Sequence, residues 1–334
     1  MSKSLTIITE GGRASGFGHI TRCISIADCF QKYGFSIKFV INGDDSIYSV
    51  LEERQIIMCN WIKYKDRLLE VLNHSSIILI DSIEIADKQI VEIQSTGMPI
   101  IFIDDEKRRN VLEKGFVVDW TVLSNKKNYF FPKKKKVVYF LGSQYTPLRE
   151  EYNAAKKNKI KENIQTIMVT FGGSDVRNLT PIFLKILNDI MPNCKKNIII
   201  GSGFSNLQEI EKFKDKNTNL ILDATASKMI EIMQESDLAI ASGGQTLYEL
   251  AKIGTPAIAI LLVENAKDDT LGWAEVGSIS YIGRWNDKKL IKNLGYKLNL
   301  LKSKKKRKQM QDCANEYINP NGAKLLVSSI IKAL

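Results

Sequence analysis

The stretch GGRASGFGHI, residues 11–20, places a histidine at the end of a glycine-rich loop, directly after the apolar run LTIIT. Glycines permit positive φ angles and close approach of the backbone to a ligand, and free N–H groups at a helix start favour a negative group. We predict that a helix begins near His19, that its positive end lowers the pKa of the imidazole, and that the neutral ring accepts a proton. The alternative is a structural turn that the histidine merely caps.

Two more glycine turns follow apolar runs and precede helices: TFGGSD at 170–175 and the start of ASGGQTLYELAKIGTP at 241–256. Each could be structural by itself, but three such turns in a basic chain predict a diphosphate site. Glu249 lies one helical turn after the last of them, and a carboxylate there can accept two hydrogen bonds from a ribose diol. A first-turn carboxylate that faces the helix dipole is the alternative for Glu249.

Short β-branched runs alternate with amphipathic segments of helical length along the chain. This alternation predicts an α/β fold with two doubly wound parallel sheets, covered by helices on both faces. The expected strands are LTIIT, SIKFVI, SIILI, PIIFI and VVYFL in the first half and TIMVTF, NIIIG, NLILD, DLAIA and PAIAILLV in the second.

The polar, Lys-rich segment YTPLREEYNAAKKNKIKENIQ separates the two sets of strands. We therefore predict an N-terminal Rossmann-like domain at 1–158, a C-terminal one at 159–318 and a terminal helix at 319–334. Ligands bind at the carboxyl ends of strands in open α/β sheets, so we expect the chemistry in a central cleft that both sheets face.

Composition narrows the class of protein. The chain has 334 residues, of which 44% are hydrophobic and 25% charged, as in an ordinary globular protein. The apolar runs are too short for a secretory signal or a membrane helix, so we expect a cytoplasmic protein without an integral membrane segment. The five cysteines form no Cys-x-x-Cys pair, which predicts reduced thiols and no metal site. No cofactor is expected.

The formal net charge of +11, with Lys-rich runs at 133–136 and 302–308, raises the possibility of a polyanion partner. We favour solvated basic surfaces and expect no nucleic-acid partner, because no aromatic residues interleave with these runs. Peripheral association with an anionic membrane stays possible, and we expect a monomer.

Five segments in order resemble the successive motifs of the PseG/SpsG family: GFGHITRC, LGSQYTPLREEY, VTFGGSDVRNLT, ASGGQTLYELAKIGTPAIAI and NGAKLLVSSIIKAL. The resemblance covers nearly the whole chain. It implies a GT-B fold of the MurG type, with the nucleotide bound mainly by the C-terminal domain and a last helix that crosses back to the first. It also implies hydrolysis of a UDP-2,4-diacetamido-2,4,6-trideoxy-β-L-altropyranose type of sugar by water, with inversion and without a metal.

The resemblance further assigns roles to residues of this chain. His19 corresponds to the catalytic histidine, which orients or deprotonates the attacking water. Glu249 would bind the ribose. The residues that would contact the UDP or the sugar are Gly16, Gly18, Arg22, Gly172, Gly173, Ser242, Gly243, Gly244, Gln245, Thr246 and Asn265.

Two departures from the family pattern fall on the sugar side. Ile83 stands where members commonly have a tyrosine, and Ala266 replaces a glutamine. The nucleotide assignment is unaffected, but the identity of the sugar stays open. A GT-B glycosyltransferase that uses a UDP-amino sugar donor is therefore the second hypothesis, and a non-enzymatic UDP-sugar-binding regulator is a third.

Overall fold

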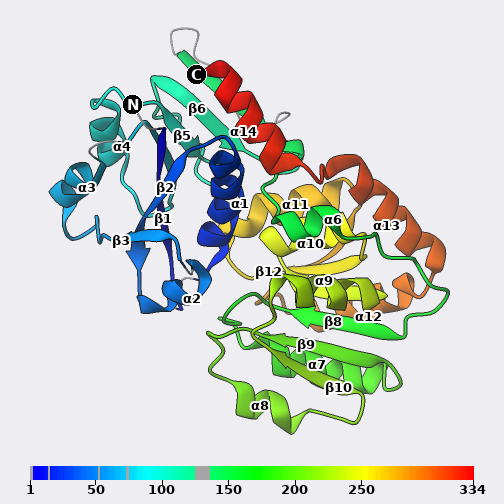
Figure 1. Cartoon of the computed structure of the whole chain (residues 1–334). Coiled ribbons are helices and arrows are strands. Elements are labelled where there is room, and N and C mark those ends of the chain that lie inside the picture. Colours follow the sequence, from blue (N-terminus) through cyan, green and yellow to red (C-terminus); the bar gives the residue numbers. More distant parts are fainter. Residues whose placement is uncertain (1–2, 14–15, 52, 73–74, 125–135) are drawn as a thin grey trace. The chain divides into compact units, whose positions relative to one another are not determined.

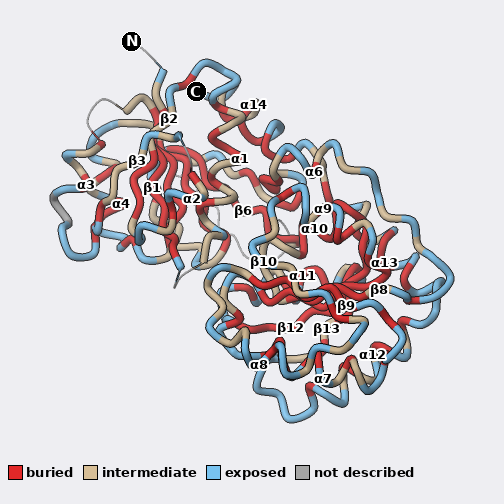
Figure 2. Tube along the Cα trace, turned by 60° about the horizontal axis from the view of Figure 1, so that its bottom comes forward, coloured by how far each residue is buried: buried red, intermediate tan, exposed pale blue. Residues whose placement is uncertain are grey.

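The computed structural model describes residues 3–13, 16–51, 53–72, 75–124 and 136–334. These residues form two compact units: Met1–Arg149 together with Asn321–Leu334, and Glu150–Pro320. Figure 2 shows that the strands at the centre of each unit are buried, whereas loops and the outer faces of helices are exposed.

The first unit is built on a seven-stranded parallel sheet with the order β3-β2-β1-β4-β5-β6-β7. The strands are β1 (Ser4–Gly11), β2 (Ser36–Gly43), β3 (Gln55–Met58), β4 (Ile77–Asp81), β5 (Ile100–Ile103), β6 (Lys114–Asp119) and β7 (Lys136–Leu141). Every residue of β5 is apolar, and so is every residue of β4 before Asp81, which is the pattern of strands buried on both faces.

Helices cover both faces of this sheet (Figure 1). They are α1 (Gly18–Lys32), α2 (Tyr48–Leu51), α3 (Lys65–Leu72), α4 (Asp87–Gln94) and α14 (Gly322–Ala333), with short 3-10 turns η1 (Asp45–Ile47) and η2 (Ser143–Tyr145). Leu68 and Leu72 of α3 and Ile90 and Ile93 of α4 pack with the strands in one core cluster. On the opposite face α14 packs against α1, so the last segment of the chain completes the first unit.

The second unit has a six-stranded parallel sheet with the order β10-β9-β8-β11-β12-β13. The strands are β8 (Thr166–Thr170), β9 (Lys195–Ile200), β10 (Thr218–Leu222), β11 (Leu238–Ser242), β12 (Ala257–Leu261) and β13 (Ile279–Arg284). The helices are α6 (Glu150–Ala154), α7 (Leu179–Ile190), α8 (Leu207–Lys212), α9 (Ala226–Glu235), α10 (Gln245–Ile253), α11 (Lys267–Glu275), α12 (Leu290–Leu301) and α13 (Lys304–Tyr317), with the 3-10 turn η3 (Glu264–Ala266).

Large apolar side chains hold the helices of the second unit to its sheet. Phe183 of α7 and Leu294 of α12 belong to one core cluster with the strands. Tyr248 of α10 and Trp273 of α11 meet edge to face, with ring centroids 5.2 Å apart. Aromatic pairs of this geometry add about 0.5–1.5 kcal/mol beyond the area they bury.

The structure confirms the predicted α/β class and the ten expected strands, and it adds β3, β6 and β13. β3 lies within residues 42–65, for which the sequence left a helix-strand-helix arrangement open, and β6 and β13 were missed because neither is a long uninterrupted apolar run. β3 is only QIIM, β6 begins with Lys114 and Gly115, and β13 contains Gly283 and ends at Arg284.

The segment between the two sets of strands belongs to the second unit from Glu150 onward, whereas the sequence placed the boundary near residue 158. The hydrogen bonds of Asn158 explain this difference. Its backbone N–H donates to the carbonyl of Ile253 at 2.6 Å, and its side-chain amide donates to that of Ser236 at 2.6 Å. The polar segment is therefore tied to the second sheet's helices rather than left as a free linker.

In each sheet the order in which the chain adds strands reverses at one internal position, which we call the reversal point. In the first unit the chain runs outward from β1 through β2 and β3 and then restarts at β4, next to β1. In the second unit the same reversal falls between β8 and β11. Loops that leave the carboxyl ends of these paired strands diverge to opposite faces, and this opens the crevice in which α/β proteins bind ligands.

Candidate functional site

The glycine loop after β1 is a tight turn that presents the start of α1. Gly12 and Gly16 exchange two backbone hydrogen bonds of 3.0 and 2.8 Å, and Gly16 has a φ of +83°. A side chain at Gly11 would collide with Ile20 of α1, so this glycine is required for packing. Gly16 and Gly18 face open space instead, and a ligand can approach their backbone closely.

His19 is the second residue of α1, and its ring is paired with a carboxylate from the neighbouring strand. Its Nδ1 lies 2.8 Å from Oδ1 of Asp81, the last residue of β4. The Asp81 side chain is 1% exposed and the His19 side chain 18%. Nη2 of Arg22 lies 3.0 Å from the same Nδ1, but a guanidinium can only donate, so Asp81 is the acceptor for a proton on Nδ1. In that tautomer Nε2 is the nitrogen that can accept a proton.

Arg22, one turn further along α1, braces this pair. Its guanidinium donates to Asp81 from Nε at 2.7 Å and from a terminal nitrogen at 2.5 Å, and to Asp105 at 2.7 Å. It also lies 4.9 Å from the ring centroid of Trp120. These bonds hold Arg22 as a positioning residue for Asp81, whereas its contact with a sugar or UDP stays a prediction.

The pKa of His19 differs from the sequence prediction. The helix end was expected to lower it, and burial does lower it, as does the nearby charge of Arg22. The attraction and hydrogen bond of Asp81, with a further contribution from Glu106, outweigh both effects and raise the pKa of His19 above its usual value. The prediction of a lowered pKa was therefore wrong, because the carboxylates on β4 and after β5 were not considered.

Asp81 keeps its charge in this setting. Burial alone would raise its pKa, but Arg22 and His19 hold it well below its usual range. Glu106 responds in the opposite way, since burial and the neighbouring Asp105 raise its pKa to about 7. Two carboxyl groups beside one imidazole thus differ in protonation near neutral pH, which is the arrangement of acid–base sites.

Sequence reasoning missed Asp81, Asp105 and Glu106 as members of the site. A signal was present, because DS follows the strand SIILI and DDE follows the strand PIIFI. These strands are β4 and β5, so the carboxylates gather at the carboxyl edge of the sheet beside the β1 loop. Placing β4 directly next to β1 requires the strand order, which the sequence alone does not provide.

Ile83 lines the same hollow as His19 and Asp81. Its backbone N–H donates to Oε1 of Glu10 at 2.7 Å, and Ser82 bonds the same carboxylate. The loop after β4 is thereby held in place, and the half-buried Ile83 side chain presents an apolar wall where the resembled family has a tyrosine.

The second unit places its glycine turns at its own reversal point. Gly172 has a φ of +80°, and both it and Gly173 face open space. The buried Asp175 side chain accepts hydrogen bonds from the backbone N–H groups of Leu179 and Thr180 at 2.9 and 2.8 Å. Asp175 therefore caps α7, and the turn before it stays open.

The turn between β11 and α10 combines a packed glycine with an open one. A side chain at Gly243 would collide with Thr270 and Ala266, whereas Gly244, with a φ of +107°, faces open space. Gln245 and Thr246 are the first two residues of α10 and carry its first N–H groups. A nine-residue helix with an open glycine at its N-cap is suited to an anion.

The remaining predicted nucleotide residues lie at adjacent strand ends. Ser242 ends β11, and Asn265 lies in η3 after β12. Glu249 is at the middle of α10 and is buried. The structure thus gathers the glycines, Ser242 and Asn265 along one edge of the second sheet, while the contacts of each with UDP stay predictions.

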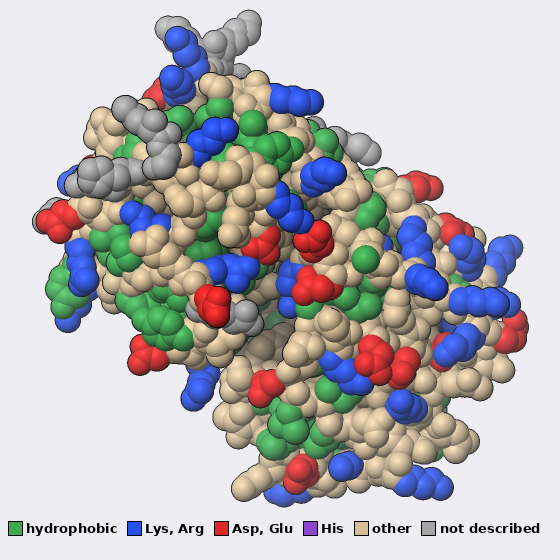
Figure 3. All heavy atoms as spheres, viewed as in Figure 1, with side chains coloured by type: hydrophobic (Ala, Val, Ile, Leu, Met, Phe, Trp, Pro, Cys, Tyr) green, Lys and Arg blue, Asp and Glu red, His purple; other side chains and the backbone are tan. Residues whose placement is uncertain are grey.

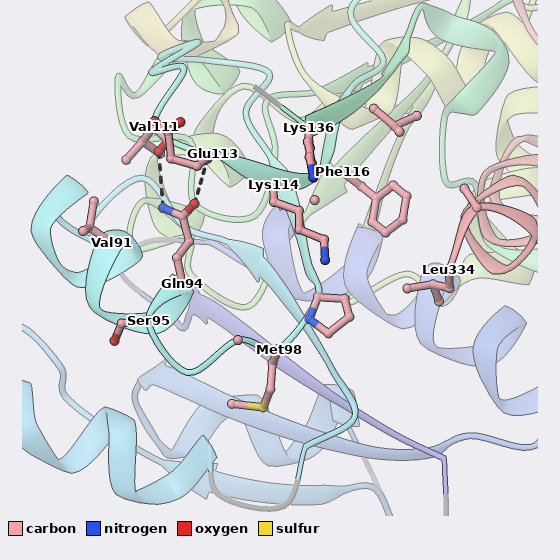
Figure 4. Close-up of a pocket in the computed structure, with 15 residues that line it drawn as sticks. Val91, Gln94, Ser95, Met98, Val111, Glu113, Lys114, Phe116, Lys136 and Leu334 are labelled. Carbon is pink, nitrogen blue, oxygen red and sulfur yellow. Dashed lines mark hydrogen bonds between the residues drawn. The ribbon is translucent and has the colours of Figure 1, made fainter. Parts of the chain in front are cut away.

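A larger cavity of about 680 Å³ lies elsewhere in the first unit. Figure 4 shows Val91, Met98, Phe116 and Leu334 around it. Lys114 and Lys136, which also line it, begin β6 and β7. It therefore lies at the amino ends of the strands, at the sheet edge opposite His19.

The second basic run lies on α13 and the residues just before it, and its cations include both ion-paired and buried ones. Figure 3 shows Lys and Arg side chains spread over the visible face with Asp and Glu among them. In α13, Lys304 pairs with Glu162 at 2.9 Å and Lys308 with Asp312 at 2.6 Å. Arg307 is fully buried. Residues 133–135 lie outside the described part of the chain.

Among the residues that the structure describes, no helix has the length and apolarity needed to cross a membrane. Nor do three or more His, Cys, Asp or Glu side chains gather there in a way that could hold a metal ion.

Comparisons with known proteins confirm the resemblance that the motifs indicated. The model of the glycosyltransferase family 28 C-terminal domain matches residues 166–326. The UDP-2,4-diacetamido-2,4,6-trideoxy-beta-L-altropyranose hydrolase of Campylobacter jejuni is 24% identical over 77% of this chain and 91% of its own length. Spore coat polysaccharide biosynthesis protein SpsG of Bacillus subtilis is 22% identical over 83% of both chains. An uncharacterized protein of Methanocaldococcus jannaschii, MJ1062, is 27% identical over 77% of this chain, and the match spans 55% of that longer relative.

Solved structures show the fold class. MurG of Acinetobacter baumannii matches with a TM-score of 0.67 at 15% identity, over 99% of both chains. The complex of S. aureus MnaA with UDP matches with a TM-score of 0.67 at 14% identity, over 100% of this chain and 97% of that one. The fold is therefore GT-B-like.

Proposed function

We propose that this protein is a UDP-sugar hydrolase, in which water displaces UDP from the anomeric carbon of a diacetamido-trideoxy or related amino sugar. The observation that carries the proposal is the His19–Asp81 pair, 2.8 Å apart at the reversal point of the first sheet. The Campylobacter relative, whose printed name is that of such a hydrolase, supports the substrate class. The names of the relatives also suggest a role in nonulosonic acid or surface-glycan biosynthesis.

His19 acts as the general base in this proposal. Asp81 holds the Nδ1 proton, and Nε2 removes a proton from water as the new bond to the anomeric carbon forms. The bond between that carbon and the diphosphate oxygen breaks, and UDP leaves from the opposite face, so the configuration inverts. The imidazolium that forms is stabilised by the charge of Asp81, which is the effect that raises the pKa of His19.

The second unit binds the leaving group in this proposal. Backbone N–H groups at Gly172, Gly173 and the start of α10 meet the diphosphate, whose charge increases as the bond breaks. Open space at Gly172, Gly173 and Gly244 supports this assignment. Glu249 is assigned to the ribose, with Ser242, Gly243, Gln245, Thr246 and Asn265 around the nucleotide.

A glycosyltransferase is the second candidate, because the matched family model is that of a glycosyltransferase C-terminal domain and Ile83 replaces the family tyrosine. An acceptor hydroxyl would then occupy the position of water. UDP release from a panel of UDP-amino sugars, measured with and without acceptors, separates the two. Release from a UDP-sugar alone supports the hydrolase, and release that depends on an acceptor refutes it.

The His19→Ala variant tests the assigned base. We expect kcat to fall by about 10²–10⁴-fold. The affinity for UDP should stay unchanged, because the nucleotide is assigned to the other unit. Turnover that survives in His19→Ala would refute this mechanism.

A further inference from the structure

Glu106 lies on the side of the His19 ring opposite Asp81. It follows β5, and its Oε1 is 4.0 Å from Nε2 of His19. Asp81 contacts Nδ1, so each ring nitrogen has a carboxylate in front of it. The two carboxylates differ in exposure, since the Asp81 side chain is 1% exposed and the Glu106 side chain 17%.

The distance of 4.0 Å between Nε2 and Oε1 exceeds that of a direct hydrogen bond. An oxygen placed about 2.8 Å from each atom satisfies both, since two such bonds span this distance at an angle near 90°. Water and sugar hydroxyls both supply such an oxygen. Ile83 and Lys107 also line the hollow around these atoms. Ile83 is one of the residues assigned to the sugar side, so an oxygen in this hollow lies beside the predicted position of the sugar.

We propose that Glu106 is a second catalytic residue, which shares the nucleophilic oxygen with His19. This inference rests on the proposed function. One hydrogen of the water moves to Nε2 of His19, while the other stays on the oxygen and donates to Glu106. The oxygen bonds to the anomeric carbon as the bond between that carbon and UDP breaks. The electron pair of the broken bond leaves with UDP. The proton on the imidazolium then passes through water to Glu106 and to solvent.

The charged groups around Glu106 fit this role. His19 and Arg22 face it from α1, Asp81 faces it from the end of β4, and Asp105 precedes it in the chain. Asp105 is held by Arg22 at 2.7 Å. Arg22 therefore holds Asp81 and Asp105 in place, while burial and the neighbouring Asp105 raise the pKa of Glu106 to about 7.

The Glu106→Gln variant tests the proposal, with Glu92→Gln as its matched control. The control makes the same chemical change at Glu92 on α4, whose partly exposed side chain lies 3.8 Å from Lys88. We expect kcat of Glu106→Gln to fall by about 10–100-fold with KM within about twofold, because the nucleophile rather than the nucleotide is affected. Glu92→Gln should match wild type. Wild-type kcat in Glu106→Gln would overturn the proposal and leave the proposed function standing.

Two further measurements exclude a merely structural effect. The pKa of His19, followed by NMR titration of the ring, should fall in Glu106→Gln because a charge that raises it is lost. In Glu106→Ala, azide should react as a nucleophile that needs no deprotonation, and a glycosyl azide should form. An unchanged His19 pKa together with no azide product would overturn the proposal. A wild-type enzyme that releases no UDP from any UDP-sugar would overturn the proposed function and this inference with it.

Discussion

The substitution Asp81→Asn removes the charge on which the whole cluster depends. Asp81 accepts hydrogen bonds from His19 at 2.8 Å and from two nitrogens of Arg22 at 2.7 and 2.5 Å. Cys23 Sγ adds a weaker contact at 3.3 Å. Asparagine has the same shape, but its amide group would direct N–H donors at the guanidinium or the ring. The substitution therefore tests charge and hydrogen bonding without leaving a cavity.

The expected loss of unfolding free energy follows from the burial of the Asp81 side chain. Removing one partner of a buried ion pair costs about 3–5 kcal/mol, and the remaining bond of Arg22 to Asp105 places this site near the lower value, about 3 kcal/mol. For catalysis, loss of the carboxylate that fixes a histidine tautomer lowers kcat by up to about 10⁴-fold. The pKa of His19 should also fall, so the rising limb of the pH–rate profile should move to lower pH while its plateau drops.

Urea unfolding and UDP release measure the two effects separately. The matched control is Asp28→Asn, which breaks the exposed pair between Asp28 and Arg54 at 2.7 Å. That pair should contribute less than about 1 kcal/mol and nothing to catalysis. The reasoning is refuted if Asp81→Asn keeps kcat within about threefold of wild type and its pH–rate limb does not move.

Three further outcomes can be checked. Gly244→Ala places a side chain at a φ of +107° over the N-terminus of α10, so we expect the unfolding free energy to fall by about 1–3 kcal/mol. Calorimetry should also show weaker UDP binding. The control is Gly34→Ala in the first unit, where φ is +80°, and this variant should lose stability but keep its affinity for UDP. The pKa values of Asp104 and Glu106 are raised to about 7 and that of Asp119 to about 6, so the folded state binds more protons than the unfolded one above about pH 4. The unfolding free energy should therefore fall as pH rises from about 4 to 7, by up to about 1.4 kcal/mol per pH unit for each such proton, and a flat profile in urea titrations would contradict this. Ile83→Tyr should change KM among UDP-amino sugars while the Kd for UDP stays constant.

The sequence was sufficient for the features that depend on local pattern. Apolar runs located ten strands, and the glycine turns were correctly placed at the carboxyl ends of strands, because such turns follow strands and precede helices in any α/β unit. It was insufficient for β13, where Gly283 and Arg284 interrupt the apolar pattern. The carboxylates around His19 could not be predicted for a different reason, because they lie 62 and 87 positions further along the chain. Only the adjacency of β1, β4 and β5 brings Asp81 and Glu106 to the ring.

The proposed reaction gives the reversal points of the two sheets different roles, and the groups placed at these points differ accordingly. In the first unit Asp81 and Glu106 face the two ring nitrogens of His19. These carboxylates favour the positive charge that develops on His19 when it takes a proton. In the second unit Gly172 and Gly244 have open space where a side chain would stand, and Gly244 is the N-cap of α10, which suits an anion. The proposed reaction therefore assigns the sugar to the first unit and the diphosphate to the second, and in that proposal the glycines near His19 serve close approach of the backbone to the sugar.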